Sequence, residues 1–413
     1  MMSDLGQAVT FAASLYRERA YIAYNGHLRR DPLALLQLGR GRDPYRLYER
    51  IRRDGPLAST YGDDWVSVSH RVCGAVLRDR RFGTHPDDGT GAASSELSFL
   101  GMNPPDHTRL RRLATPAFSP KAVASYTGRI ESTISALLDK ATAAGRFDLV
   151  SEFAAPLPIA VITDLLGVPD SDSAAFARYG ALIGSALGGI RSLRHAAQLA
   201  ASEAPLQQLF EGIFELRRRE PRDDIVSTLV AAPEDQIKPA EMVPMCLLLL
   251  VAGFETTVNL IGNSVLALLR HPEQWHALCA DPETMAPKAV EETLRYDPPV
   301  QLTSRFALQP VELEGKPIAK GESVTTLIGG ANRDPEAYER PATFDISRDS
   351  EVGNLSFSSG IHYCIGQPLA RLEATMALRT LAERMPALSL AGPVRQRSSS
   401  VIRGPLSLPV RAR

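Results

Sequence analysis

The chain has 413 residues, of which 44% are hydrophobic and 23% are charged, and its formal net charge is -1. This is ordinary globular composition with enough apolar content for a large core. The near-zero charge argues against a nucleic-acid footprint covering the whole protein, so no nucleic-acid partner is predicted.

The four cysteines lie far apart, and none belongs to a C-x-x-C pair. This spacing argues against a disulfide scaffold and against a zinc site, and it indicates a reducing, cytoplasmic setting. At the N-terminus the run AVTFAASLY is interrupted at Arg17, so no secretory signal is predicted. The longest unbroken apolar run, residues 245–252, is too short to span a bilayer. The cysteines are Cys73, Cys246, Cys279 and Cys364.

The first elements in chain order are a helix and a hairpin. Asp43 is a good N-cap and Pro44 suits a first helical position, which predicts a helix to about Arg53. Two short alternating segments follow, Leu57–Tyr61 and Trp65–Val68. They predict a small β-hairpin.

From about residue 106 to 296 the sequence predicts almost continuous helix. The longest element runs from about Glu241 to Arg270, where His271 and Pro272 stop the pattern. It is apolar on nearly every face between Met245 and Ala252. We therefore expect this helix to run through the interior of the protein rather than across its surface.

After Tyr296 the pattern changes to short strand-like segments. A loop-rich passage, residues 329–364, leads to one more helix at about 367–386, and the chain ends in further strand-like pieces. No linker interrupts the sequence, so we predict one domain, residues 1–413, mainly α with small β-sheets. Its helix-rich core is predicted at about 106–296 and 365–386, and its β-rich parts at about 55–70, 299–328 and 387–413.

The central helix contains the segment AGFETT, residues 252–257. Glycine costs about 1 kcal/mol in a helix interior relative to alanine, and a buried carboxylate is costly unless it is paired. One explanation is a packing notch at a helix crossing, with Glu255 reaching solvent. The other is the wall of a site, where a locally opened helix admits water and an acid and an alcohol relay protons. The segment alone leaves both explanations open.

Two further motifs are weak by themselves. In EETLR, Glu292 and Arg295 lie one turn apart, but exposed pairs of this kind are common and contribute little. In NPPDHTRLRR, His107 and Arg111 share one helix face. That face is either a solvated basic surface or a site for a carboxylate or phosphate.

The most specific motif is the loop FSSGIHYCIG, with the spacing F-x-x-G-x-H-x-C-x-G just before a helix. Cys364 alone could be an inert buried thiol. It could also be a nucleophile with His362 as its base. The third option is a metal-bound thiolate, because the two glycines let backbone N–H groups approach the sulfur.

These pieces, in this order, closely resemble the cytochrome P450 haem-thiolate monooxygenases in their soluble bacterial form, and the resemblance covers most of the chain. It implies the cytochrome P450 fold, with a long central helix over a buried haem. It also implies haem b (iron protoporphyrin IX) as the cofactor and O2 as a co-substrate.

The resemblance assigns roles around the cysteine. Cys364 would be the axial ligand of the haem iron and would push electron density onto it, and Phe357 would pack beside the thiolate, in a loop shaped by Gly360 and Gly366. His362 would then donate a hydrogen bond to a haem carboxylate instead of acting as a base. The residues implied to hold the haem propionates are His107, Arg111, Arg305 and His362. The residues implied to form a structural triad are Glu292, Arg295 and Arg348.

The resemblance also assigns roles on the central helix. Ala252 and Gly253 would leave room for dioxygen and substrate. Thr256 would hydrogen-bond to the bound oxygen, and Glu255 would relay protons from solvent. A peroxygenase or a rearrangement enzyme of this family is expected to lack such a pair, so its presence favours true oxygen activation.

The substrate pocket, by resemblance, would be lined by the loop near residues 84–100, by Val300 and Leu302, and by a turn at Val401, with the helices around 172–218 as a lid. The lid sequence GALIGSALGGI is small, apolar and uncharged. It favours a mostly apolar, medium-to-large substrate such as a polyketide, a macrolide or a terpenoid.

The expected partners are a separate ferredoxin and ferredoxin reductase, which would supply electrons from NAD(P)H. Arg109 and Arg112 would lie on the far side of the propionate-facing helix. They form either a dock for an acidic partner or a plain solvated face.

Two alternatives come from other classes of protein. A haem-thiolate protein could bind or sense a ligand without turnover, although Glu255 and Thr256 weigh against that. A cysteine hydrolase without haem would need an oxyanion hole and an acid to orient His362, and the sequence identifies neither.

Overall fold

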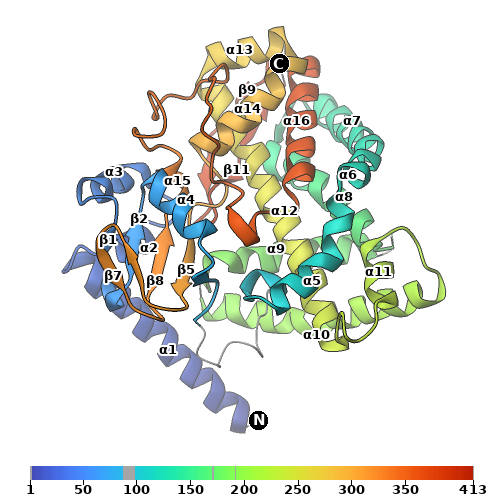
Figure 1. Cartoon of the computed structure of the whole chain (residues 1–413). Coiled ribbons are helices and arrows are strands. Elements are labelled where there is room, and N and C mark those ends of the chain that lie inside the picture. The colour runs from blue at the N-terminus through green and yellow to red at the C-terminus, as the bar shows by residue number, and fades with distance from the viewer. Residues whose placement is uncertain (1, 87–97, 170–171, 191, 413) are drawn as a thin grey trace.

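The computed structural model describes residues 2–86, 98–169, 172–190 and 192–412. Helix α12 (Pro239–Arg270) runs through the middle of the molecule, and Figure 1 shows it in yellow between the other helices. Its 32 residues make a rod about 48 Å long. The predicted interior helix is confirmed, and it begins two residues before the predicted start because Pro239 occupies its first turn, where proline is tolerated.

Several helices contact α12 along its length and form the main apolar core with it. Among the described residues, α12 is the helix long and apolar enough to cross a membrane, but 78% of its most apolar window is buried inside the fold. This burial is the pattern of a core helix. The helices packed against α12 are α8 (Pro156–Leu166), α9 (Ser173–Gly184), α10 (Leu193–Arg219), α13 (Pro272–Ala280), α14 (Pro282–Tyr296) and α16 (Gln367–Arg384).

The other side of the molecule is built on a five-stranded sheet, with the strand order β1-β2-β8-β5-β3. Strands β2 and β8 pair in parallel and the remaining neighbours pair antiparallel. The predicted hairpin is confirmed as β1 and β2. The strands are β1 (Ala58–Ser59), β2 (Trp65–Ser67), β3 (Phe82–Gly83), β5 (Thr303–Ala307) and β8 (Ser323–Thr326).

Three smaller sheets complete the β structure. Strand β4 interrupts the segment that the sequence predicts as almost continuous helix, because it pairs with β12 near the C-terminus. A pairing between such distant segments leaves no local signal. The strands are β4 (Arg146–Asp148), β6 (Val311–Leu313), β7 (Lys316–Ile318), β9 (Ser389–Leu390), β10 (Arg395–Gln396), β11 (Pro405–Ser407) and β12 (Pro409–Arg411).

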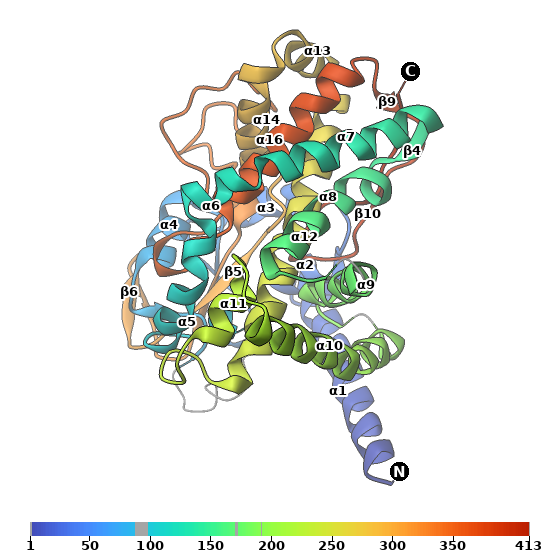
Figure 2. The same ribbon diagram turned by 90° about the vertical axis from the view of Figure 1, so that its right-hand side faces the viewer.

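The remaining helices cover the ends and the sheet. In Figure 2, α1 extends away from the body of the molecule, and α7 crosses beside α16. The predicted helix near residue 44 is present as α3, whose N-cap is Pro44 rather than Asp43. These helices are α1 (Met2–His27), α2 (Pro32–Leu38), α3 (Tyr45–Arg53), α4 (His70–Arg78), α5 (Asp106–Ala114), α6 (Pro120–Ser125), α7 (Thr127–Ala144), α11 (Ile225–Ala231) and α15 (Ile328–Ala331).

Candidate haem-thiolate site

The cysteine loop precedes α16 and is closed by its own backbone. The Cys364 N–H donates to the Phe357 carbonyl at 2.9 Å. Gly360 has a φ of +69°, and a Cβ there would lie 2.4 Å from the carbonyl oxygen of Leu77. Both the left-handed conformation and the close backbone approach require glycine at this position. The loop is therefore held in one shape before any ligand is considered.

The side chain of Cys364 is exposed to solvent on one side, and its other sides are surrounded by protein atoms. Burial by those atoms raises the pKa of the thiol, whereas N–H groups of Gly366 and Gln367 and the nearby Arg111 guanidinium lower it. Gly366 is the N-cap of α16, so the donors aimed at the sulfur come from a helix N-terminus. This arrangement suits a thiolate that faces a cation better than it suits a neutral thiol.

Behind the loop, Arg371 of α16 lies with its guanidinium carbon 4.5 Å from the centre of the Phe357 ring. The same guanidinium contacts Glu291 at 2.5 Å. Phe357 is thus held between the cysteine loop and a paired cation. Arg371 lies five residues beyond the FSSGIHYCIG motif, and the sequence did not indicate this stacking.

Two histidines meet beside the cysteine loop. His107 of α5 is buried, and neither of its ring nitrogens has a hydrogen-bond partner. The His362 ring lies 4.2 Å from it, centre to centre, and the Nε2 atom of His362 also lacks a partner. Burial, followed by the Arg111 charge, lowers the pKa of His107 to about 4. Burial, followed by the charges of His107, Arg305 and Arg111, lowers the pKa of His362 to about 3.

Two arginines complete this cluster. Arg111 donates to the Tyr363 carbonyl, and burial lowers its pKa. Arg305 of β5 donates to Ser358 Oγ at 3.3 Å and to Thr303 Oγ1 at 2.9 Å, and burial lowers its pKa to about 10.

The four donor residues therefore come together from α5, β5 and the cysteine loop. Within the described ranges, no ion pair joins any of them to a carboxylate. Buried donors without acceptors are costly, so this cluster fits an anionic group that brings its own oxygen atoms. We call His107, Arg111, Arg305 and His362 the cation cluster.

The A-G-x-E-T turn of α12 is the part of this buried helix that meets accessible space. Ala252 is exposed and Thr256 is half-buried, although the flanking turns are buried. Thr256 Oγ1 donates to the Ala252 carbonyl at 2.7 Å, which occupies its only hydrogen. Gly253 packs against α8, since a Cβ there would lie 3.2 Å from Ile162 Cδ1. A helix that is closely packed on one side and open on the other can form the wall of a site.

Glu255 is only 3% exposed. The packing-notch explanation, in which this side chain reaches solvent, is therefore wrong on that point. Its Oε1 lies 2.6 Å from Arg397 NH1, which comes from the C-terminal part of the chain. Nothing in the local spacing relates Arg397 to the central helix, so the sequence gives no sign of this contact.

Glu292, Arg295 and Arg348 also come together. Arg295 forms two hydrogen bonds of 2.7 Å to the Glu292 carboxylate, and Arg348 Nε lies 3.2 Å from Oε2. The Glu292 and Arg295 side chains are almost fully buried, so the exposed-pair alternative is wrong. The two guanidiniums also donate to carbonyls of Asn332, Glu339, Arg340, Pro341 and Thr343. This set fastens α14 to the passage that leads to the cysteine loop.

The residues expected to line a substrate pocket fall into two groups. Val300 bridges Ile402, and the next residue donates from its N–H to the Val401 carbonyl at 2.8 Å, so Val300 and Val401 lie at one crossing of the chain. Leu302 packs against the apolar cluster beneath α2 and α3. Of the loop near residues 84–100, residues 87–97 lie outside the described part of the chain.

Arg109 is not the free surface cation that both alternatives, a partner dock and a plain solvated face, assumed. Its guanidinium lies 2.7 Å from both Asp106 and Glu241, and it also donates to the Gln236 carbonyl. Arg109 therefore joins α5 to the start of α12 and is already paired. Arg112 is exposed on the same helix.

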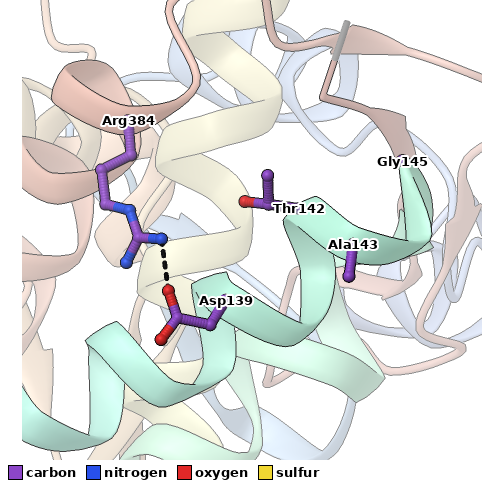
Figure 3. Close-up of a pocket in the computed structure, with 5 residues that line it drawn as sticks. All are labelled: Asp139, Thr142, Ala143, Gly145 and Arg384. Atoms are coloured by element: carbon purple, nitrogen blue, oxygen red, sulfur yellow. Dashed lines mark hydrogen bonds and ion pairs between the residues drawn. The ribbon is translucent and has the colours of Figure 1, made fainter.

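A surface pocket of about 440 Å³ lies away from this site. Figure 3 shows Arg384, in the last turn of α16, turned toward Asp139 of α7, and the two charges lie 2.6 Å apart. The cysteine loop precedes the first turn of α16, so roughly 25 Å of helix separates this pocket from Cys364. It is lined by Asp139, Thr142, Ala143, Gly145 and Arg384.

Comparisons with known proteins agree with this geometry. Residues 195–385 match the family model described as cytochrome P450. The chain is 39% identical over 389 residues to cytochrome P450 monooxygenase PikC of Streptomyces venezuelae, covering 90% of this chain and 91% of that protein. It is 36% identical to 6-deoxyerythronolide B hydroxylase of Saccharopolyspora erythraea, covering 89% of this chain and 96% of that protein.

The fold agrees as well. A crystal structure of P450BioI, in complex with acyl carrier protein ligated to hexadec-9Z-enoic acid, superposes with a TM-score of 0.82 at 36% identity. That match covers 89% of this chain and 98% of the other. Sequence identity at this level extends over nearly the whole chain, and the cysteine loop and the cation cluster are both present. Together these findings establish the family. The chain belongs to the cytochrome P450 family and is a haem-dependent monooxygenase of that family.

Proposed function

We propose that this enzyme hydroxylates or epoxidises a mostly apolar small molecule, inserting one oxygen atom from O2. The observation that carries this proposal is the cation cluster, which leaves buried nitrogen donors without acceptors beside Cys364. A protein that used Cys364 as a nucleophile would have no need of two buried histidines with partnerless ring nitrogens beside two arginines, and within the described residues no carboxylate contacts His362 to orient it.

In this proposal the cation cluster holds the two haem propionates, and Cys364 ligates the iron. Haem, when bound, supplies the chemistry of oxygen activation, with the thiolate donating electron density to iron. The N–H groups of Gly366 and Gln367 stabilise the negative sulfur. Propionate charges would also relieve the mutual repulsion within the cluster, which is what depresses the pKa values of His107 and His362 beyond the effect of burial.

Proton delivery is assigned to the turn of α12. Thr256 gives its own hydrogen to the Ala252 carbonyl, so the lone pairs of Oγ1 remain to accept a hydrogen bond from an incoming proton donor. Glu255 is the adjacent acid and would take protons from solvent and pass them toward that hydroxyl. Ala252 is exposed, and in this proposal its open side would leave room for dioxygen and substrate.

The substrate class rests on the lid and on similar proteins. Gly180 and Gly184 let α9 pack closely on α12, against Leu250 and Glu255 respectively, and the lid sequence carries no charge. Among similar proteins, one is named as a hydroxylase of 6-deoxyerythronolide B, and P450BioI was crystallised with a fatty acid on its carrier protein. A polyketide, a macrolide or a terpenoid fits this setting. Electrons would come from NAD(P)H through a ferredoxin and its reductase in the cytoplasm.

The first experiment is optical. We expect the reduced protein to give the red-shifted Soret band of a thiolate-ligated haem when carbon monoxide is added. Cys364→Ala should abolish that band. Thr256→Ala should keep the band but release peroxide in place of product, measured as oxygen consumed per product formed once a screen for spin-state shifts has identified a substrate. Full coupling in the Thr256 variant would contradict the role of this hydroxyl.

A further inference from the structure

The carboxylate of Glu255 is enclosed by three elements. It lies on α12 and is 3% exposed. The end of α9 lies against it, since a Cβ at Gly184 would be 3.3 Å from Glu255 Oε2. On another side Arg397, the residue directly after β10, brings its NH1 to 2.6 Å from Glu255 Oε1. Protein atoms therefore shield this carboxylate from most of the bulk solvent.

Arg397 is fastened to α12 at two successive turns. Besides the contact with Glu255, its Nε donates to Asn259 Oδ1 at 2.9 Å. The Asn259 amide in turn donates to the Glu255 carbonyl at 2.7 Å, so its orientation is fixed by the same stretch of helix. A guanidinium bound at two points is a more rigid anchor than a single ion pair.

The β10–β11 hairpin, which carries Arg397, packs against α12. The Arg397 N–H donates to the Gly404 carbonyl at 3.0 Å, which joins the two arms of the β10–β11 hairpin. A Cβ at Gly404 would lie 2.1 Å from Asn259 Oδ1, so only glycine fits there. Figure 1 shows β11 beside α12. The position of the guanidinium is thus set by the backbone and not only by its own side chain.

We propose that Arg397 is a positioning residue for proton delivery, holding Glu255 ionised and in place next to Thr256. This inference rests on the proposed function above. An adjacent positive charge favours the charged form of a buried carboxyl, and the carboxylate is the form that can accept a proton. In each cycle the carboxylate takes one proton from solvent and passes it on toward the Thr256 hydroxyl, so Glu255 returns to its ion pair with Arg397 unchanged.

The test uses the haem-loaded enzyme without substrate, supplied with NADPH, a plant-type ferredoxin and its reductase at a ferredoxin concentration that no longer limits the rate. Under these conditions O2, two electrons and two solvent protons give hydrogen peroxide, and the measurements are the rate of peroxide formation and its solvent deuterium isotope effect. Arg397→Gln should lower the rate by about tenfold and change the isotope effect, as expected for an impaired acid–base relay. Arg397→Lys, which restores the charge, should recover part of the rate.

Two comparisons separate positioning from a structural defect. Glu255→Gln should slow the reaction to a similar extent, and the double variant should be no slower than Glu255→Gln alone, because both changes remove one interaction. Arg395→Gln, on the same hairpin at an exposed position, should behave like the unmodified enzyme. All variants should keep the carbon monoxide band.

If Arg397→Gln kept the rate and isotope effect of the unmodified enzyme while Glu255→Gln was slowed, this inference would be overturned and the proposed function would stand. Multiplying effects in the double variant would overturn it too. A missing carbon monoxide band in the unmodified enzyme would instead refute the proposed function.

Discussion

Two clusters of polar and charged residues lie near the cysteine loop, and they differ in whether a carboxylate of the chain pairs with their cations. Glu292, Arg295 and Arg348 are buried as a paired set, with the guanidinium groups also bound to backbone carbonyls. The cation cluster is buried or half-buried, no carboxylate of the described residues forms an ion pair with it, and the pKa values of its members are depressed. A set of charges that the chain neutralises itself is part of the scaffold. A set that the described residues leave without anions is what the proposed haem-binding role requires.

The largest effect is expected from a substitution that disrupts the ion pairs of Glu292 with Arg295 and Arg348. Glu292→Gln keeps the shape of the side chain but leaves Arg295 and Arg348 as buried cations without a carboxylate. Removing one partner of a buried ion pair costs about 3–5 kcal/mol, so we expect a loss of that order in the free energy of unfolding, measured in urea. The matched control is Glu291→Gln at the preceding position. Glu291 is 45% exposed and should cost less than about 1 kcal/mol. Equal losses would remove the contrast between the two glutamates.

The second change tests the cluster without anions. Arg305→Leu removes a buried cation whose pKa is lowered to about 10 by burial. In haem-free protein we expect unchanged or increased stability, because an unpaired buried charge is removed. Haem affinity should fall by about tenfold or more, the size of one charge-assisted hydrogen bond. Urea unfolding of the haem-free protein and haem titration measure the two effects. A large loss of stability with unchanged haem affinity would place Arg305 in the scaffold instead.

The third expected effect appears only at high pH and concerns Glu373 of α16, a buried acid that belongs to neither cluster. It is 3% exposed, its Oε2 has no hydrogen-bond partner, and burial raises its pKa to about 8. The folded protein therefore keeps a proton that the unfolded chain releases near its ordinary pKa of 4.5. The stability from this group is complete below that pH and is lost as the pH rises toward 8.

Glu373→Gln imitates the protonated acid. We expect no change in melting temperature at pH 4.5 and a gain at pH 8.5, equivalent to about 1–3 kcal/mol. Glu383→Gln, exposed on the same helix, is the control and should show no such difference between the two pH values. A gain at low pH, or none at high pH, would mean that Glu373 is charged in the fold.

The contrast between the clusters also explains what could be predicted. His107 with Arg111, and Glu292 with Arg295, are neighbours on single helices, so their spacing alone placed them together. The cysteine loop is equally local, since Gly360 needs its backbone conformation and Cys364 bonds back to Phe357 within a few residues. Arg305 and Arg348 joined these pairs only through the family resemblance, because each comes from a distant part of the chain.

The sequence by itself determined the family, the interior course of α12 and the identity of the residues around Cys364, because helix periodicity and short-range spacing are written in consecutive residues. Only the tertiary structure decided which distant side chains complete them. Arg109 faces Glu241 instead of a partner protein, and Glu255 faces Arg397 instead of solvent. Such contacts depend on how helices and hairpins pack, and the sequence around either residue carries no sign of the other.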